Sequence, residues 1–201
     1  MLPDIKSFTQ EELQAQFAGW KQPAYRVAQL LEWLYVQRVA SWDAMTNLPK
    51  ALRETLRENF SLAGLELIRK QGSGDTTQKF LWKLADGQFI ESVLIPANPA
   101  LYGEASDRHT LCISTQVGCA YGCKFCASGL DGWKRNLGVH EIVEQILATE
   151  RTVTSDERRV KGEATPSLAT VRSVARICST ISCTPRFRFH PSNPLAQNLQ
   201  P

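Results

Sequence analysis

Apolar residues recur at three- and four-residue spacing through the first third of the chain, which predicts amphipathic helices. Thr9 and Glu12 match a capping box that begins a short helix, and Gly19 is expected to end it. A second helical pattern covers residues 23–39, and a third leads to Phe60. These patterns predict a small all-helical module.

Three tryptophans in this module allow two interpretations. Trp20, Trp33 and Trp42 could pack in the helical core or offer stacking surfaces for nucleobases. Aromatic residues at helical spacing mostly serve burial, so core packing is favoured.

From residue 65 the pattern becomes extended. Residues 79–84 and 88–95 flank an Ala-Asp-Gly turn, which predicts a β-hairpin. Glu91 interrupts the apolar second strand. The spacing favours a solvent-facing side chain there, with a carboxylate held beside a site as the alternative. A polar loop follows, and residues 109–115 are expected to form one strand that leads into a cysteine-rich loop.

A convincing amphipathic helix is expected after the cysteine-rich loop. Its apolar face contains Val139, Ile142, Val143, Ile146 and Leu147, and its polar face contains Glu141, Glu144, Gln145 and Glu150. Strand, ligand-bearing loop and helix form the opening unit of a βα barrel, so we expect an α/β fold. No further barrel strand is recognisable after this helix.

Composition places the chain in a reducing compartment and divides it near residue 157. No run of about 18 apolar residues and no signal peptide is visible, so we expect a cytoplasmic protein without a membrane span. Residues 157–201 hold seven Lys and Arg against two Glu, a net charge of +5 against −2 for the rest. This tail lacks periodicity. We interpret it as disordered or unpatterned sequence in preference to a basic RNA-binding arm.

The closest group of reactive side chains in the sequence is a set of three thiols within eight residues, Cys119, Cys123 and Cys126. Clustered cysteines in a reducing compartment indicate metal or redox chemistry. Thiolates select zinc or iron–sulfur clusters, and such sites usually have four protein ligands, whereas this loop supplies three. The spacing favours an iron–sulfur cluster with an open position. The alternative is a zinc knuckle completed by His109 or Cys112.

The C-x3-C-x2-C loop, with Phe125 before its third cysteine, resembles the signature loop of radical S-adenosylmethionine (SAM) enzymes. That resemblance implies a 4Fe–4S cluster held by the three thiolates. It also implies that SAM binds the fourth iron, which makes Phe125 part of a cofactor-binding loop.

Several segments together resemble the RlmN family of dual-specificity RNA methyltransferases. They are residues 25–35, 45–49, 90–93, 111–119 and 135–142. The resemblance implies methylation of adenine C2 in 23S rRNA and certain tRNAs through a methyl-cysteine intermediate. It also implies a monomer that takes electrons from a donor such as flavodoxin or ferredoxin.

The same resemblance divides the chain and assigns individual residues. Residues 1–62 would contact RNA, 63–108 would form a β linker, and 109–156 would begin the radical SAM barrel. Glu91 matches the acid–base carboxylate. Cys112 matches the thiol that pairs transiently with a second, methyl-carrying cysteine near the family's C-terminus.

The chain departs from the family pattern after Arg151. The Gly-Glu-Pro segment that grips SAM is not recognisable, and Cys178 and Cys183 lie in the tail without a matching context. We therefore expect a truncated or frame-shifted, inactive member of the family. The alternative is a cluster- or zinc-bearing RNA-binding fragment without catalysis. A different radical SAM enzyme is disfavoured by the helical module and the Glu91 strand.

Overall fold

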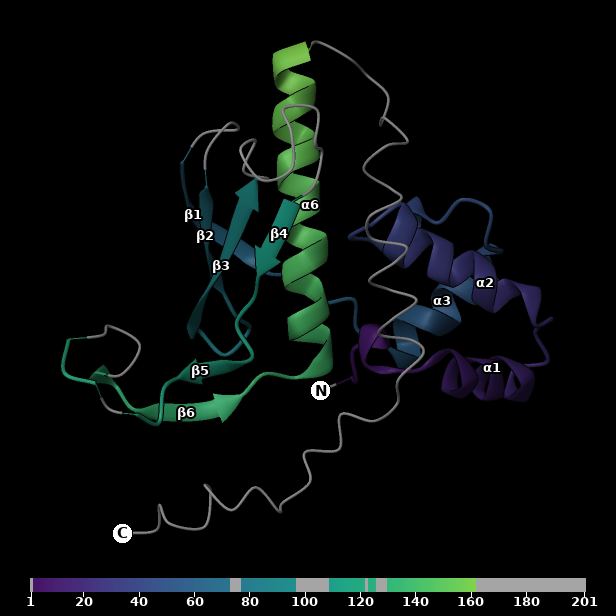
Figure 1. Cartoon of the computed structure of the whole chain (residues 1–201). Helices are drawn as coiled ribbons and strands as arrows, with labels where there is room; N and C mark the ends of the chain where they lie inside the picture. The colour runs from purple at the N-terminus through teal and green to yellow at the C-terminus, as the bar shows by residue number, and fades with distance from the viewer. Residues whose placement is uncertain (1, 73–76, 97–108, 122, 126–129, 162–201) are drawn as a thin grey trace, which may run out of the picture.

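The computed structural model describes residues 2–72, 77–96, 109–121, 123–125 and 130–161. A helical module and a β-sheet lie on opposite sides of one long helix, α6 (Val139–Lys161). Figure 1 shows this arrangement, with the N-terminus close to the start of α6. The predicted α/β fold is confirmed. The two tail cysteines, Cys178 and Cys183, lie outside the described residues.

The helical module is built as its local signals predict. Thr9 Oγ1 accepts from the Glu12 N–H at 3.2 Å, and Glu12 Oε2 accepts from the Thr9 N–H at 2.7 Å. The capping box is therefore confirmed. The elements are η1 (Ile5–Ser7), α1 (Gln10–Gly19), α2 (Tyr25–Leu31), the π-helical turn η2 (Glu32–Val36), η3 (Trp42–Ala44) and α3 (Lys50–Asn59).

The core of this module includes the predicted tryptophans. Trp42 is buried, while Trp20 and Trp33 are partly buried and pack against the same core. Trp33 Nε1 also donates to the Asn47 side-chain oxygen. The interpretation of these residues as packing residues is confirmed.

The four-stranded sheet is antiparallel, in the order β1 (Glu66–Gln71), β2 (Gln78–Lys83), β3 (Phe89–Pro96) and β4 (His109–Cys112). The β2–β3 pair is the predicted hairpin. Alternate residues face α6, where Phe80 and Trp82 are almost fully buried. The other face points away from α6.

The predicted strand over residues 109–115 is interrupted, and this corrects the sequence-based expectation. Strand β4 already ends at Cys112, and β5 (Gln116–Gly118) begins just after the predicted bounds and pairs with β6 (Trp133–Asn136) in a separate antiparallel ribbon. The reason lies at Ser114. Its N–H donates to Gln145 Oε1 and its carbonyl accepts from Gln145 Nε2, both at 2.9 Å. The Gln145 side chain thus makes the two hydrogen bonds to the Ser114 backbone that a neighbouring strand would otherwise make.

Helix α6 also corrects the predicted division of its faces. Glu144 and Gln145 were assigned to the polar face, but they are 4% and 0% exposed. The helix is covered on two sides, by the sheet and by the helical module, so part of its polar face becomes an interface. It also continues past the predicted boundary at residue 157 to Lys161. Across the described residues, no helix combines the length and apolarity needed to cross a bilayer.

Candidate active site

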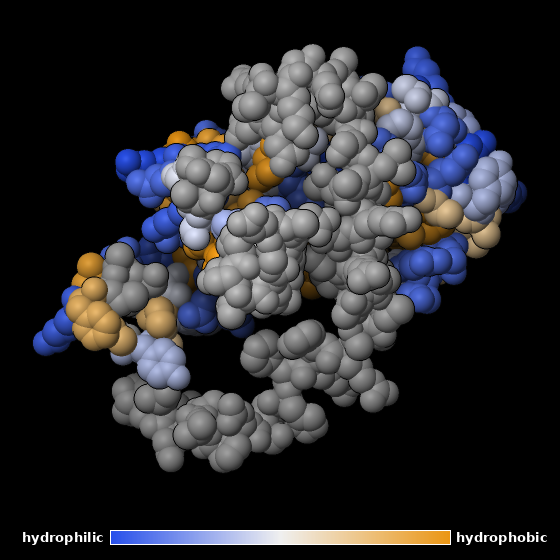
Figure 2. All heavy atoms as spheres, turned by 45° about the horizontal axis from the view of Figure 1, so that its top comes forward, coloured by the Kyte–Doolittle hydropathy of each residue, from blue (hydrophilic) through white to orange (hydrophobic). Residues whose placement is uncertain are grey.

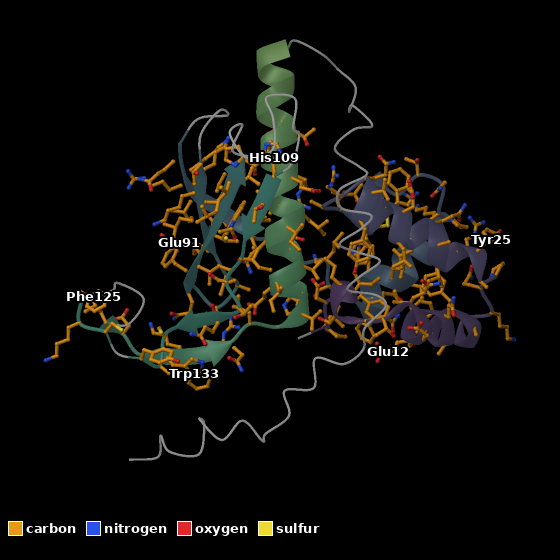
Figure 3. The ribbon with its side chains drawn as sticks, in the orientation of Figure 1. Glu12, Tyr25, Glu91, His109, Phe125 and Trp133 are labelled. Carbon is orange, nitrogen blue, oxygen red and sulfur yellow. The ribbon has the colours of Figure 1, made fainter. Side chains whose placement is uncertain are left out.

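The two residues expected to perform acid–base and thiol chemistry lie on one open face of the sheet. Val93 pairs directly with Cys112, and Glu91 is two residues before Val93 on β3. Glu91 and Cys112 are therefore diagonal neighbours on the same face, a relation that places such residues roughly 7–8 Å apart. Both are exposed. Figure 3 shows Glu91 on the side of the sheet away from α6.

A lysine on β2 joins this pair. Lys79 is also paired directly with Val93, on the side opposite Cys112. Its ammonium lies 2.7 Å from Glu91 Oε1, and both side chains are about half exposed. Sequence analysis missed Lys79, although the register of the predicted hairpin could have suggested that it lies near Glu91.

The backbone behind Glu91 is held by polar contacts on the covered side of the sheet. Ser92 Oγ donates to Gln145 Oε1 at 2.9 Å and accepts from Trp82 Nε1 at 3.1 Å. Ser114 Oγ donates to the Glu91 carbonyl at 2.8 Å. The open face is thus presented by a strand whose position is fixed from behind.

The cysteine loop leaves from the end of the β5–β6 ribbon. Its neck is narrow, because the Cys119 N–H donates to the Gly132 carbonyl at 3.2 Å. Gly118 makes this closure possible. Its φ is +75°, and a Cβ there would lie 1.9 Å from the Gly132 oxygen.

Two of the three predicted cluster ligands are described. Cys119 and Cys123 are half-buried free thiols, and Cys126 lies outside the described residues. No group of three or more His, Cys, Asp or Glu side chains is close enough to hold a metal within the described part of the chain. The two described thiols fit a cluster by donor type, because soft sulfur ligands suit iron–sulfur sites.

The loop exposes apolar side chains beside the thiols. Tyr121 and Phe125 are 88% and 94% exposed. Figure 2 shows orange, apolar atoms at this projecting end of the molecule. His109, the candidate zinc ligand, lies at the opposite end of the sheet from Phe125 in Figure 3. That placement disfavours a zinc site shared by His109 and the loop.

An arginine connects the ribbon to the rest of the site. Arg135 on β6 contacts Asp86, in the β2–β3 turn, and Glu141, in the first turn of α6. The pKa of the Glu141 carboxyl is held below its usual value mainly by its hydrogen bonds from Arg135. Desolvation raises the pKa of Asp86, but hydrogen bonds from the Gln88 N–H and Arg135 outweigh it and lower the pKa overall.

Known proteins resemble this chain over the region just described. Residues 3–62 match the family described as the ribosomal RNA large subunit methyltransferase N-terminal domain. A protein from Akkermansia muciniphila, named "Probable dual-specificity RNA methyltransferase RlmN", is 51% identical over 149 residues. That alignment covers 74% of this chain and 42% of the relative. A protein of the same name from Bacillus velezensis is 44% identical over 158 residues, or 79% of this chain and 41% of the relative.

A solved structure gives the same result for the fold. The crystal structure of a radical SAM methyltransferase from Sphaerobacter thermophilus superposes with a TM-score of 0.65 at 39% identity. The match covers 78% of this chain and 44% of that protein. This chain spans about two fifths of the length of the relatives it matches.

Proposed function

We propose that the chain is part of a radical SAM enzyme that methylates adenine C2 in RNA. Two findings support this: residues 3–62 match the ribosomal RNA large subunit methyltransferase N-terminal domain family, and about 150 residues are related to RlmN methyltransferases. The observation that supports this most directly is the open sheet face shared by Glu91 and Cys112. A carboxylate and a thiol on neighbouring positions can divide proton removal and sulfur attack between them.

The cysteine loop has the proposed role of holding the cofactors. Cys119, Cys123 and Cys126 would bind a 4Fe–4S cluster, and Phe125 lies in the same loop. When bound, the cluster and SAM would supply the radical that activates a methyl group carried by a second cysteine. An electron donor such as flavodoxin or ferredoxin is part of this proposal.

The residues of the sheet face would complete the reaction. Glu91 would take the proton from the RNA carbon that has gained the new carbon substituent. The Cys112 sulfur would attack the sulfur of the second cysteine, forming a disulfide as the carbon–sulfur bond breaks. The unpaired electron that radical addition leaves on the ring would return through the electron-transfer partner. The electron pair of the broken bond would pass to the departing carbon, and Glu91 would return its proton there to complete the methyl group. Lys79 would hold the Glu91 carboxylate in place through their 2.7 Å contact.

The proposed RNA substrates are 23S rRNA and tRNA, as the family resemblance implies. Residues 1–62 would contact the RNA, residues 63–108 would link this module to the site, and residues 109–156 would begin the radical SAM domain. We also propose a cytoplasmic monomer. Of the proposed domain boundaries, the one after residue 62 coincides with the change from helices to strands.

Anaerobic reconstitution of the chain with iron and sulfide tests the cluster. We expect the absorbance and the iron and sulfide content of a 4Fe–4S cluster, with loss of both in Cys119→Ala, Cys123→Ala and Cys126→Ala. Cys178→Ala is the matched control and should retain the cluster. A single tightly bound zinc that depends on His109, with no iron uptake, would contradict the proposal.

A further inference from the structure

Among the residues that the structure describes, a small ribbon at its base connects the cysteine loop to the rest of the fold. Strands β5 and β6 contain three and four residues, and within the described part of the chain they form a two-stranded sheet of their own. A two-stranded ribbon is marginally stable on its own. Figure 1 shows this ribbon extending from the lower edge of the main sheet, away from the helical module. Its direction must therefore depend on contacts at its base.

Arg135 makes the ion pairs at this base, beside a Lys134 hydrogen bond to Gln88 and the packing of Val117 in the core of the sheet. Its NH1 and NH2 groups each donate to one oxygen of Glu141 at 2.8 Å, which is the two-pronged geometry of a guanidinium–carboxylate pair. Its Nε donates to Asp86 Oδ2 at 2.8 Å, and NH2 lies 2.6 Å from the same oxygen. One guanidinium therefore engages two carboxylates on two different elements.

Both carboxylates belong to parts of the scaffold that present the site. Asp86 lies in the turn that joins β2 to β3, the strand of Glu91, and its side chain also accepts from the Gln88 N–H at 3.0 Å. Glu141 caps the beginning of α6 by accepting from the Gly138 N–H at 2.8 Å. Arg135 thus joins the ribbon, the Glu91 hairpin and α6 at one point.

We propose that Arg135 is the positioning residue that fixes the direction of the cysteine loop relative to the sheet face of Glu91 and Cys112. The importance of that direction rests on the proposed function, in which chemistry at the loop must reach this face. Exposed ion pairs usually contribute little. Here the fork geometry and the two carboxylates give directional restraint, which a single point charge such as lysine cannot reproduce.

The direction of the loop can be measured as a distance in the chain without cofactors. Nitroxide labels are placed on Cys119 and on a cysteine introduced by Ser155→Cys near the far end of α6, with the five other cysteines replaced by serine. Pulsed electron paramagnetic resonance should give one narrow distance distribution. Arg135→Gln should broaden or shift it while circular dichroism and the melting temperature of the rest of the chain change little.

Further variants separate positioning from general destabilisation. Arg135→Lys keeps the charge without the fork and should remain broadened, whereas Asp86→Asn and Glu141→Gln each remove one connection and should give intermediate widths. Arg57→Gln is the control, because it removes an exposed arginine pair with Asp43 inside the helical module. If Arg135→Gln fails to fold, the width of the distance distribution in Asp86→Asn tests the proposal instead. An unchanged distribution in that variant overturns the proposal.

Iron retention distinguishes this inference from the proposed function. Reconstituted Arg135→Gln should release iron to a chelator faster than the parent chain and the Arg57→Gln control. A parent chain with a narrow distance but no iron would contradict the cluster and leave the positioning role intact. A parent chain that holds iron, with the same distance distribution in Arg135→Gln, would overturn the positioning role alone.

Discussion

Gln145 illustrates how one polar side chain can organise a site from behind. It is fully buried, and its amide satisfies both backbone groups of Ser114 and the Ser92 hydroxyl. A helix pattern assigns glutamine to the solvent side, so the sequence could not identify this role. The information lies in the partner, Ser114, which is 31 residues away along the chain.

Replacing Gln145 should therefore destabilise the fold more than its polarity suggests. Gln145→Leu leaves the Ser114 N–H and carbonyl without partners, and each unsatisfied buried group costs about 1–3 kcal/mol. Urea unfolding should give a lower free energy of unfolding by that order. Gln14→Leu, at an exposed position of α1, should stay within about 0.5 kcal/mol of the parent. Equal effects of the two substitutions would contradict this account.

The Arg135 contacts also predict a pH dependence. The pKa values of Asp86 and Glu141 are lowered in the folded chain, so both carboxyls bind protons less readily there than in the unfolded chain. Their stabilising contribution is complete above the ordinary carboxyl pKa of about 4 and is lost as the pH falls through the lowered folded values. The free energy of unfolding should decrease in this acidic range. Glu141→Gln should flatten part of that decrease, and an unchanged profile would argue against the coupling.

At the scale of elements, the sequence identifies structures with strong local signals. Thr9 with Glu12 marks a helix start, and the turn at residues 85–87 marks a hairpin, because the residues that create each signal are close in sequence. Strand β6 was not predicted. Its four residues, Trp133–Asn136, show no alternation, and they become a strand only by pairing with β5.

The neck of the cysteine loop offers a matched pair of glycine substitutions. Gly118→Ala places a methyl group 1.9 Å from the Gly132 oxygen and also forces alanine to a φ of +75°. We expect the β5–β6 pairing to open and iron retention to fall. Gly132→Ala is the control, since its φ is +67° but its Cβ would meet nothing within 4 Å, so only a backbone cost of about 1–2 kcal/mol applies. Iron content after reconstitution should be highest in the parent chain, lower in Gly132→Ala and lowest in Gly118→Ala. If Gly118→Ala kept more iron than Gly132→Ala, the close contact between residues 118 and 132 would not be what retains the iron.

At the scale of the whole molecule, buried charges join the helical module to α6. Lys6 Nζ lies 3.2 Å from Glu144 and 3.6 Å from Asp4, with all three side chains at most 5% exposed. Arg38 pairs with Glu150 at 2.6 Å. Sequence patterns could not indicate this docking, because the residues paired across the interface are more than 100 positions apart and each looks like an ordinary surface charge.

Removing the buried lysine should therefore be costly. Lys6→Met leaves Asp4 buried without a cation, whereas Glu144 keeps its pair with Arg151. Breaking a buried pair costs on the order of 3–5 kcal/mol, and we expect a loss near the lower end of that range. Chemical denaturation should show a loss of this size, and combining Lys6→Met with Glu144→Leu should recover part of it. Lys50→Met, which removes an exposed pair with Glu54, should cost less than about 1 kcal/mol. If the loss were as small as that of Lys50→Met, the buried charges would not be what holds the helical module against α6.

The 201-residue chain assayed alone is expected to form no 2-methyladenosine. The proposed reaction needs a second, methyl-carrying cysteine, and neither Cys178 nor Cys183 has a context that resembles it. The measurement is an anaerobic assay with SAM, a reductant and a 23S rRNA fragment, followed by nucleoside analysis. Product above the level of a Cys119→Ala control would show that this prediction is wrong.

The position of α6 in the sequence has a consequence for synthesis on the ribosome. The core face of the sheet, with Phe80 and Trp82, is covered by Ile142, Ala148 and Val153 of this helix. At elongation rates of about 5–20 residues per second, the finished β2–β3 hairpin waits on the order of seconds before α6 leaves the exit tunnel. During that interval a stacked pair of large aromatic rings lies open to solvent. Nascent chains paused between these two segments should be the ones that recruit chaperones.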